Sequence, residues 1–170
     1  MMNRRSVLKI GATTLAGTLV DPPAFGTKAG PAGCAVHRAV FDERFKECQV
    51  FAAELRVTGV STSAIQGDVA NLWYDDLRAQ LRKGRAPVAG LTDRASLFCL
   101  EELARDVGML VILRVDHIVN PEKPEPEFGR AMAQLVSHFD EHEPPDASAQ
   151  KRTGPFSPKN MTALVFWILA

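Results

Sequence analysis

Residues 109–115 read MLVILRV, an almost unbroken apolar run rich in β-branched side chains. A strand that is apolar on both faces must be covered on both faces, which is typical of a central strand in a parallel sheet. Two elements precede this run. The first is a short apolar run that ends at Gly90, and the second is an amphipathic helix at 94–107, which Thr92 or Asp93 can cap. This unit predicts a small α/β domain with a three-layer, mostly parallel sheet of a minimal Rossmann-like or flavodoxin-like type.

The same succession of strand, helix and strand occurs earlier in the chain. We expect a strand at 35–41, a helix at 43–58 that Gly59 ends, and a weaker strand at 60–65. The segment 71–85 then predicts a turn or two of basic amphipathic helix. With 170 residues, of which 46% are hydrophobic, the chain has material for one domain with a real core.

The C-terminal third differs in composition. We therefore place the α/β core at 35–119 and a proline-rich linker at 120–160, with one helix at 128–139 inside it. The last ten residues, 161–170, read MTALVFWILA and predict a final buried strand. This run is too short to cross a membrane as a helix, so we expect no stable membrane span.

The N-terminus carries paired arginines in the sequence NRRSVLK, followed by a mildly apolar run at 10–20. The pattern resembles a twin-arginine export signal, which we assign to residues 1–26. It predicts a periplasmic or secreted protein. Cys34 follows Ala32 and Gly33 as in a lipoprotein box, but Pro31 stands where that box needs a large aliphatic residue.

Charge and cysteine content limit the partners. Twenty basic and twenty acidic residues cancel, so no electrostatic feature predicts a nucleic-acid partner. A small-molecule ligand or a periplasmic protein partner fits such a chain better. Cys48 and Cys99 both fall inside predicted helices, where a disulfide between them requires that the two helices pack on the same face of the sheet.

Polar side chains follow several predicted strands. Asp42, Asp68, Thr92, Asp116 and His117 all come just after an apolar run. In a parallel sheet these positions share one edge, where open α/β sheets place their ligand sites. We assign catalytic roles to Asp116 and His117 and ligand-binding roles to the other three. The alternative is that each aspartate only caps a helix.

Two further candidates depend on local pattern. Trp73 and Tyr74 could line a ligand pocket, although aromatic side chains more often serve packing. His138 and His142 stand in HFDEH, which matches the inverted zinc-protease pattern, but no third ligand is evident. A solvated helix end explains the histidines better, so we expect no metal site. The sequence has no GxGxxG, GxxxxGK[ST] or GxSxG motif, and the cofactor stays unknown.

The segments VFDERF, GDVANLWYDDL and AGLTDRASLFCLEELARD together resemble a group of uncharacterised proteobacterial exported proteins that begin with a twin-arginine signal. The resemblance covers residues 1–117. It implies export and a shared fold, and it assigns no activity and no functional residue.

Two functions follow as hypotheses. The first is an exported domain that binds a ligand or serves as an accessory protein of a periplasmic system such as a redox system, which the missing catalytic motifs favour. The alternative is a small periplasmic enzyme that uses acid and base side chains at the carboxyl edge of the sheet. Polar residues converging in one pocket would favour the enzyme, and separate helix caps would favour the binding protein.

Overall fold

The computed structural model describes residue 36 and residues 38–139 and 161–170. It contains a five-stranded sheet in the order β2-β1-β3-β5-β4. The strands are β1 (Arg38–Asp42), β2 (Ser61–Ile65), β3 (Val88–Asp93), β4 (Val111–Val119) and β5 (Thr162–Leu169). The helices are α1 (Lys46–Val57), α2 (Ala70–Leu72), the π-helical turn η1 (Trp73–Leu77), α3 (Arg78–Lys83), α4 (Arg94–Arg105) and α5 (Pro126–Ser137).

The α/β class is confirmed, but the sheet is mixed rather than mostly parallel. Strand β1 pairs in parallel with β2 and β3, whereas β5 pairs antiparallel with both β3 and β4. Four strands therefore run in one direction, with the C-terminal strand inserted between two of them in the opposite direction. The expectation that the run at 109–115 forms a central strand was wrong, because β4 lies at the edge of the sheet and eight of its nine residues are only partly buried or exposed. The doubly buried strand next to it is β5, whose last six residues are all buried.

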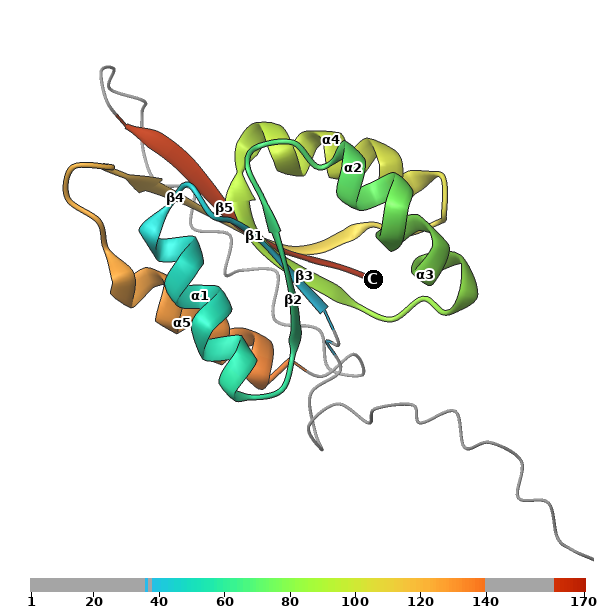
Figure 1. Cartoon of the computed structure of the whole chain (residues 1–170), viewed down its shortest axis with the longest axis horizontal. Coiled ribbons are helices and arrows are strands. Elements are labelled where there is room, and N and C mark those ends of the chain that lie inside the picture. The colour runs from blue at the N-terminus through green and yellow to red at the C-terminus, as the bar shows by residue number, and fades with distance from the viewer. Residues whose placement is uncertain (1–35, 37, 140–160) are drawn as a thin grey trace, which may run out of the picture.

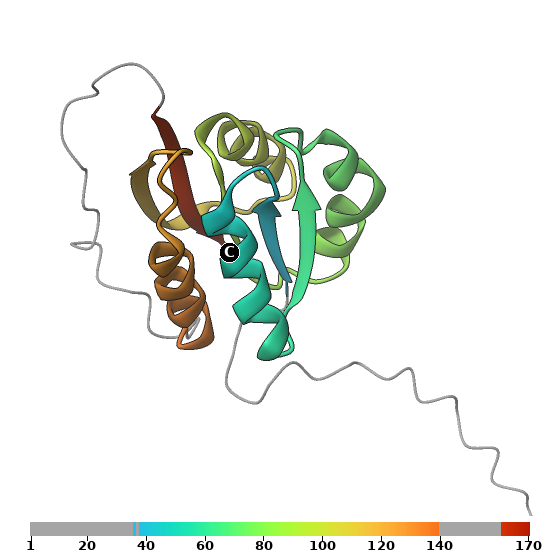
Figure 2. The same ribbon diagram turned by 60° about the vertical axis from the view of Figure 1, so that its left-hand side comes forward.

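Helices cover both faces of the sheet (Figures 1 and 2). Helices α1 and α5 pack together over one face, and α4 with the α2–η1–α3 segment covers the other. Successive side chains of β5 alternate between the two cores: Phe166 lies with α1 and α5, and Trp167 lies on the opposite face. Within the described part of the chain, no helix is long and apolar enough to span a membrane.

Local sequence signals place the helix ends where they were predicted. The side chain of Asp93 caps α4 by accepting a hydrogen bond of 2.7 Å from the backbone N–H of Ser96. Gly59 and Gly108 follow α1 and α4 with φ angles of 86° and 76°. These left-handed conformations are unstrained only for glycine, which explains why each helix stops at this point.

One boundary differs from the prediction in a way that matters for function. Strand β4 does not end at Val115 but continues to Val119, because β5 pairs with it as far as Thr162. Asp116 and His117 therefore lie inside the strand and not beyond its carboxyl end. Neighbouring residues of a strand point to opposite faces of the sheet, so these two side chains are separated.

Cys48 and Cys99 are free thiols. Cys48 lies on α1 and Cys99 on α4, which cover opposite faces of the sheet, so they cannot form a disulfide. Burial raises the pKa of the Cys48 thiol. Cys34 lies outside the described residues.

Candidate functional site

Arg44, just beyond the carboxyl end of β1, joins the side chains of Asp42 and Asp93 at the carboxyl edge of the sheet. Asp42 is the last residue of β1 and its side chain is fully buried. Arg44 folds back onto it, with Nε donating to Oδ1 at 2.9 Å and Nη2 donating to Oδ2 at 2.6 Å. The same Nη2 donates to Oδ2 of Asp93 at 2.8 Å. One guanidinium group thus bridges the ends of β1 and β3.

The contacts of this bridge favour the charged forms of Arg44 and Asp93. The hydrogen bond to Asp42 raises the pKa of Arg44 further above its usual value, and Asp93 adds to the effect. Partial burial of Asp93 acts to raise its pKa, but hydrogen bonds from Ser96 and Arg44 outweigh burial and leave the pKa lowered. The raised pKa of Arg44 and the lowered pKa of Asp93 both favour the charged form, so neither group is suited to exchange protons near neutral pH.

A glycine makes room for this bridge. Gly67 follows β2 with a φ of 84°, and a Cβ built there would lie 2.6 Å from Cζ of Arg44. The carbonyl oxygen of Gly67 accepts a hydrogen bond of 3.1 Å from the hydroxyl of Ser96. The loop after β2 is thereby tied to the first turn of α4 beside the guanidinium group.

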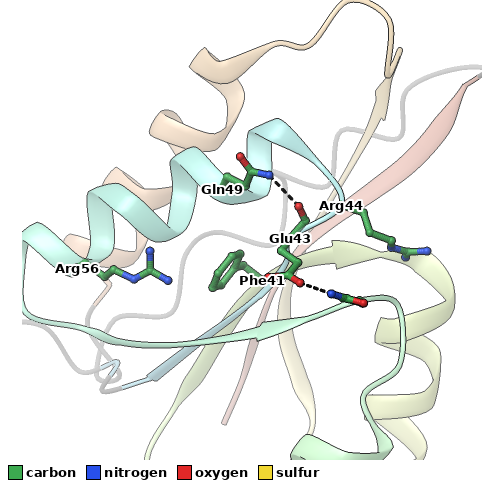
Figure 3. A pocket seen from close by; sticks show the side chains of 6 residues that line it. Phe41, Glu43, Arg44, Gln49 and Arg56 are labelled. Carbon is green, nitrogen blue, oxygen red and sulfur yellow. Dashed lines mark hydrogen bonds between the residues drawn. The ribbon is translucent and has the colours of Figure 1, made fainter.

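An open groove of about 730 Å³ lies next to the bridge, between α1 and the edge strand β2 (Figure 3). Phe41 forms its floor, and its ring lies between α1 and β2. This volume falls in the range of small-ligand sites, which usually combine apolar surface with a few placed polar groups. The lining residues are Phe41, Glu43, Arg44, Gln49, Arg56 and Gln66.

Arg56 marks one end of the groove. Its Nε donates to the hydroxyl of Thr62 at 2.7 Å, and its Cζ lies 5.2 Å from the centroid of the Phe41 ring. These two contacts hold the guanidinium group over the floor. Among the described residues, no carboxylate forms a salt bridge with Arg56, so its charge is available to an anionic group.

Glu43 marks the other end. Its carboxylate accepts a hydrogen bond from the side-chain amide of Gln66, and its backbone carbonyl accepts one of 2.8 Å from Gln49 Nε2. Figure 3 shows Arg56 and Glu43 on either side of the Phe41 ring. The groove therefore has a cationic end, an aromatic floor and an anionic end.

Sequence reasoning did not single out Glu43, Arg44 or Arg56. The first two follow Asp42 directly at the end of a predicted strand, which is the signal that could have identified them. Arg56 has no comparable signal, because it sits in the last turn of a helix, where a basic residue is expected for the helix dipole alone.

The structure does not gather the five predicted edge residues into one pocket. Asp42 belongs to the bridge, whereas Asp68 is exposed and accepts a hydrogen bond of 2.8 Å from the backbone N–H of Ala70, as a helix-starting residue does. The Thr92 side chain is fully buried, and its hydroxyl accepts a hydrogen bond of 3.1 Å from the indole N–H of Trp167.

Asp116 and His117 lie apart from this edge and from each other. Asp116 faces α4 and accepts hydrogen bonds of 2.9 Å from Arg94 and 3.0 Å from Arg114. Partial burial acts to raise its pKa, but the two arginines outweigh burial and leave the pKa lowered. His117 faces α5, where its ring stacks on Phe128 with centroids 4.0 Å apart. They do not form a catalytic pair.

His117 has one further feature. Its Nε2 lies 3.3 Å from a carboxylate oxygen of Glu125, yet this buried nitrogen makes no hydrogen bond. The contact is therefore an ion pair only when the imidazole is protonated.

The two aromatic candidates do not line the groove. Trp73 is buried in the core on the face of the sheet that α4 also covers, whereas Tyr74 is exposed and lies near Arg78. This arrangement agrees with a packing role for Trp73.

The histidine motif is only partly described. His138 ends α5 with its Nδ1 2.8 Å from the carbonyl oxygen of Gln134, and His142 lies outside the described residues. No group of three metal-ligating side chains is found where the structure describes the chain.

Comparisons with protein-family models, with curated proteins and with solved structures found no match to this chain.

Proposed function

We propose that this protein is an exported α/β domain that binds a short, extended peptide in the groove between α1 and β2. It would serve as a binding or accessory protein of a periplasmic system, a redox system included, and would have no catalytic role of its own. The observation that carries the proposal is the placement of Arg56 and Glu43 at opposite ends of the groove, with Phe41 between them.

The length of the groove selects an elongated ligand. Arg56 contacts Thr62 of β2, and Glu43 contacts Gln66, which directly follows β2 and is four positions further along the chain. At the rise of a β-strand, four positions correspond to about 13 Å. A free amino acid cannot bridge this separation, whereas an extended chain of three residues spans about 10 Å before its terminal groups are counted.

The charges of the groove suggest a direction for the peptide. Its terminal carboxylate would pair with Arg56 in the fork geometry that guanidinium groups favour. Its terminal ammonium group would lie at Glu43, and a middle residue would pass the small exposed part of the Phe41 ring. The peptide would thus run antiparallel to β2.

The topology supports a ligand site in this region. In the order β2-β1-β3, the chain covers one face of the sheet with α1 and the other with the α2–η1–α3 segment. This is the order around the β1/β3 switch point of flavodoxin-like sheets, which here lies at the Arg44 bridge, next to the Glu43 end of the groove. We infer a minimal three-layer relationship of this kind for the part of the sheet that contains β1, β2 and β3.

Binding fits this edge better than catalysis does. A general acid or base works best when its pKa lies near the operating pH. The Asp42 carboxylate is occupied by Arg44, and the pKa of Asp93 is lowered. The alternative, a small enzyme, would have to use the Glu43 carboxylate, which accepts a hydrogen bond from Gln66.

Calorimetric titration with trialanine tests the proposed ligand. We expect trialanine to bind, and both its C-terminal amide and its N-acetylated form to bind at least about tenfold more weakly, because each lacks one terminal charge. Free alanine should not show measurable binding. Arg56→Gln should weaken trialanine binding by a similar factor and should lose the preference for the free carboxylate over the amide.

Arg82→Gln is the matched control, since it removes the same charge from an exposed position on α3. It should leave the affinity unchanged. Absence of trialanine binding at millimolar concentration, or equal binding by Arg56→Gln, would show that the groove does not hold a peptide carboxylate.

We propose export by the twin-arginine route on the basis of the paired arginines Arg4 and Arg5, which lie outside the described residues. Replacing both with lysine keeps the charge and removes only the arginine identity. In a bacterial host with a working twin-arginine pathway, we expect the natural chain in the periplasmic fraction and the double-lysine variant in the cytoplasm. Equal export of both chains, measured by immunoblotting of the two fractions, would contradict this route.

A further inference from the structure

Strand β2 forms one edge of the sheet and pairs only with β1 in the described part of the chain. The strand reads STSAI, and the groove with Phe41 at its floor lies between this strand and α1 (Figure 3). An edge strand presents backbone N–H and C=O groups that have no partner within the sheet. Such groups can pair with an added extended chain, so the direction in which each β2 residue points bears on the groove.

One hydrogen bond shows which β2 residues face outward. The backbone N–H of Glu43 donates to the carbonyl oxygen of Ile65 at 3.0 Å, so the backbone groups of Ile65 point toward β1. Successive residues of a strand alternate in this direction, and Ser63 therefore also points toward β1. The backbone groups of Thr62 and Ala64 consequently point away from the sheet. Neither makes a backbone hydrogen bond to a loop or helix of the described chain.

The side chains of these two residues lie on the groove side of the sheet. Arg56 of α1 donates to the Thr62 hydroxyl at 2.7 Å, so Thr62 points to the face that α1 covers. Ala64 lies two positions further and shares this face, whereas Ile65 belongs to the opposite core. Ala64 is exposed. A residue that paired with Ala64 from outside would place its own side chain on the same face, beside the groove.

We propose that the bound peptide adds to β2 as a sixth, antiparallel strand, with its second residue directly opposite Ala64. This inference rests on the proposed peptide-binding function and adds the mode of binding to it. Ala64 lies midway between Thr62 and Gln66, the residues that the two charged ends of the groove contact. A three-residue chain centred on Ala64 therefore brings its carboxylate to the Arg56 end and its ammonium group to the Glu43 end.

This register uses one peptide amide and not the other. In an antiparallel pair, opposite residues whose backbone groups face each other exchange two hydrogen bonds. The N–H of the second peptide residue donates to the carbonyl oxygen of Ala64, and the carbonyl oxygen of that residue accepts from the Ala64 N–H. The N–H of the third peptide residue points away from β2. The two amide nitrogens of a tripeptide thus have different surroundings.

Registers shifted by one residue are less favourable. With the first and third peptide residues opposite Ala64 and Thr62, the ammonium group withdraws from Gln66 by about 3.4 Å, the rise of one strand residue. A shift in the other direction withdraws the carboxylate from Thr62 by the same distance. The centred register keeps both terminal charges at the ends of the groove and lets the second residue pass the Phe41 ring.

Calorimetric titration with two N-methylated forms of trialanine tests the pairing. Both forms keep the terminal charges, and each carries one methyl group on one peptide nitrogen. We expect methylation at the second residue to weaken binding at least about tenfold, because it removes the donor to Ala64 and places a methyl group against the strand. Methylation at the third residue is the matched control and should change the dissociation constant less than about threefold.

Ala64→Pro tests the same pairing from the side of the protein. Proline removes the outward N–H of this residue and no hydrogen bond between β1 and β2, and edge strands tolerate proline at such positions. We expect trialanine to bind about tenfold more weakly. Ala64→Ser keeps the N–H and should bind trialanine as the natural chain does. Thermal unfolding checks that Ala64→Pro is folded, and the methylated peptides test the pairing without any variant.

The outcomes separate the added strand from the proposed function. If trialanine binds and the two methylated forms bind equally well, the added strand is wrong and the peptide is held by its terminal charges alone. If methylation at the third residue causes the larger loss, the register centred on Ala64 is wrong. Absence of trialanine binding would overturn the proposed function and the added strand together.

Discussion

Replacing Gly90 with alanine is expected to lower the free energy of unfolding by about 3–5 kcal/mol, a large share of the stability of a small domain. Gly90 lies in the buried strand β3 opposite Trp167 of β5. A Cβ at this position would lie 2.1 Å from Cζ2 of the indole ring. The ring cannot yield easily, because Trp167 is fully buried and its N–H is bonded to the buried hydroxyl of Thr92. Chemical denaturation monitored by tryptophan fluorescence measures the loss.

Two comparisons identify the cause of this loss. Gly84→Ala is the matched control, since a Cβ there meets no atom within 4 Å, and we expect its effect to stay within about 0.5 kcal/mol. Trp167→Leu removes the ring, so adding Gly90→Ala to it should cost much less than in the natural chain. Equal costs in the two backgrounds would show that the indole ring does not restrict position 90.

The second large effect is expected at Gly129, where alanine should destabilise the protein by about 2–4 kcal/mol. In an open helix the same change stabilises by about 1 kcal/mol, so the sign itself is diagnostic. A Cβ on Gly129 would lie 2.1 Å from the backbone oxygen of Glu47, which means that α1 and α5 would have to separate. Their separation would also strain the 2.7 Å hydrogen bond from the backbone N–H of Glu125 to the buried Glu47 carboxylate.

Ala131→Gly on the exposed side of α5 provides the reference for helix propensity. It should cost about 1 kcal/mol, without any effect on the contact between α1 and α5. Thermal unfolding by circular dichroism compares the two variants. A more stable Gly129→Ala protein would mean that the two helices are not in backbone contact at this position.

Much of the local structure could be predicted from the sequence, because it depends on neighbouring residues. Asp93 begins α4 and Gly108 follows its end, as expected from helix-capping chemistry. The apolar run at 161–170 forms a strand, also as expected. The order of the strands could not be predicted, because β5 finds its place between β3 and β4 through pairing across long chain separations.

In the candidate site too, features that depend on neighbouring residues could be predicted, whereas contacts between side chains could not. Asp42 was identified because it ends a strand, but the sequence did not show that Arg44, two residues later, folds back onto its carboxylate. Asp116 was expected beyond a strand end, since a charged residue after an apolar run resembles a boundary. It is tolerated inside β4 because this edge strand is only partly buried and two arginines neutralise the carboxylate.

The position of β5 also sets the order in which the protein can be completed during synthesis. Within the sheet, β3 and β4 are connected only by their pairing with β5, which is made after every other described element. Until the ribosome has released this last strand, both of its future neighbours have an unpaired side, and such nascent chains are prone to aggregate. A chaperone that shields the growing polypeptide until β5 has left the ribosome would therefore be most useful for this fold, and a stop codon just before β5 should yield insoluble material.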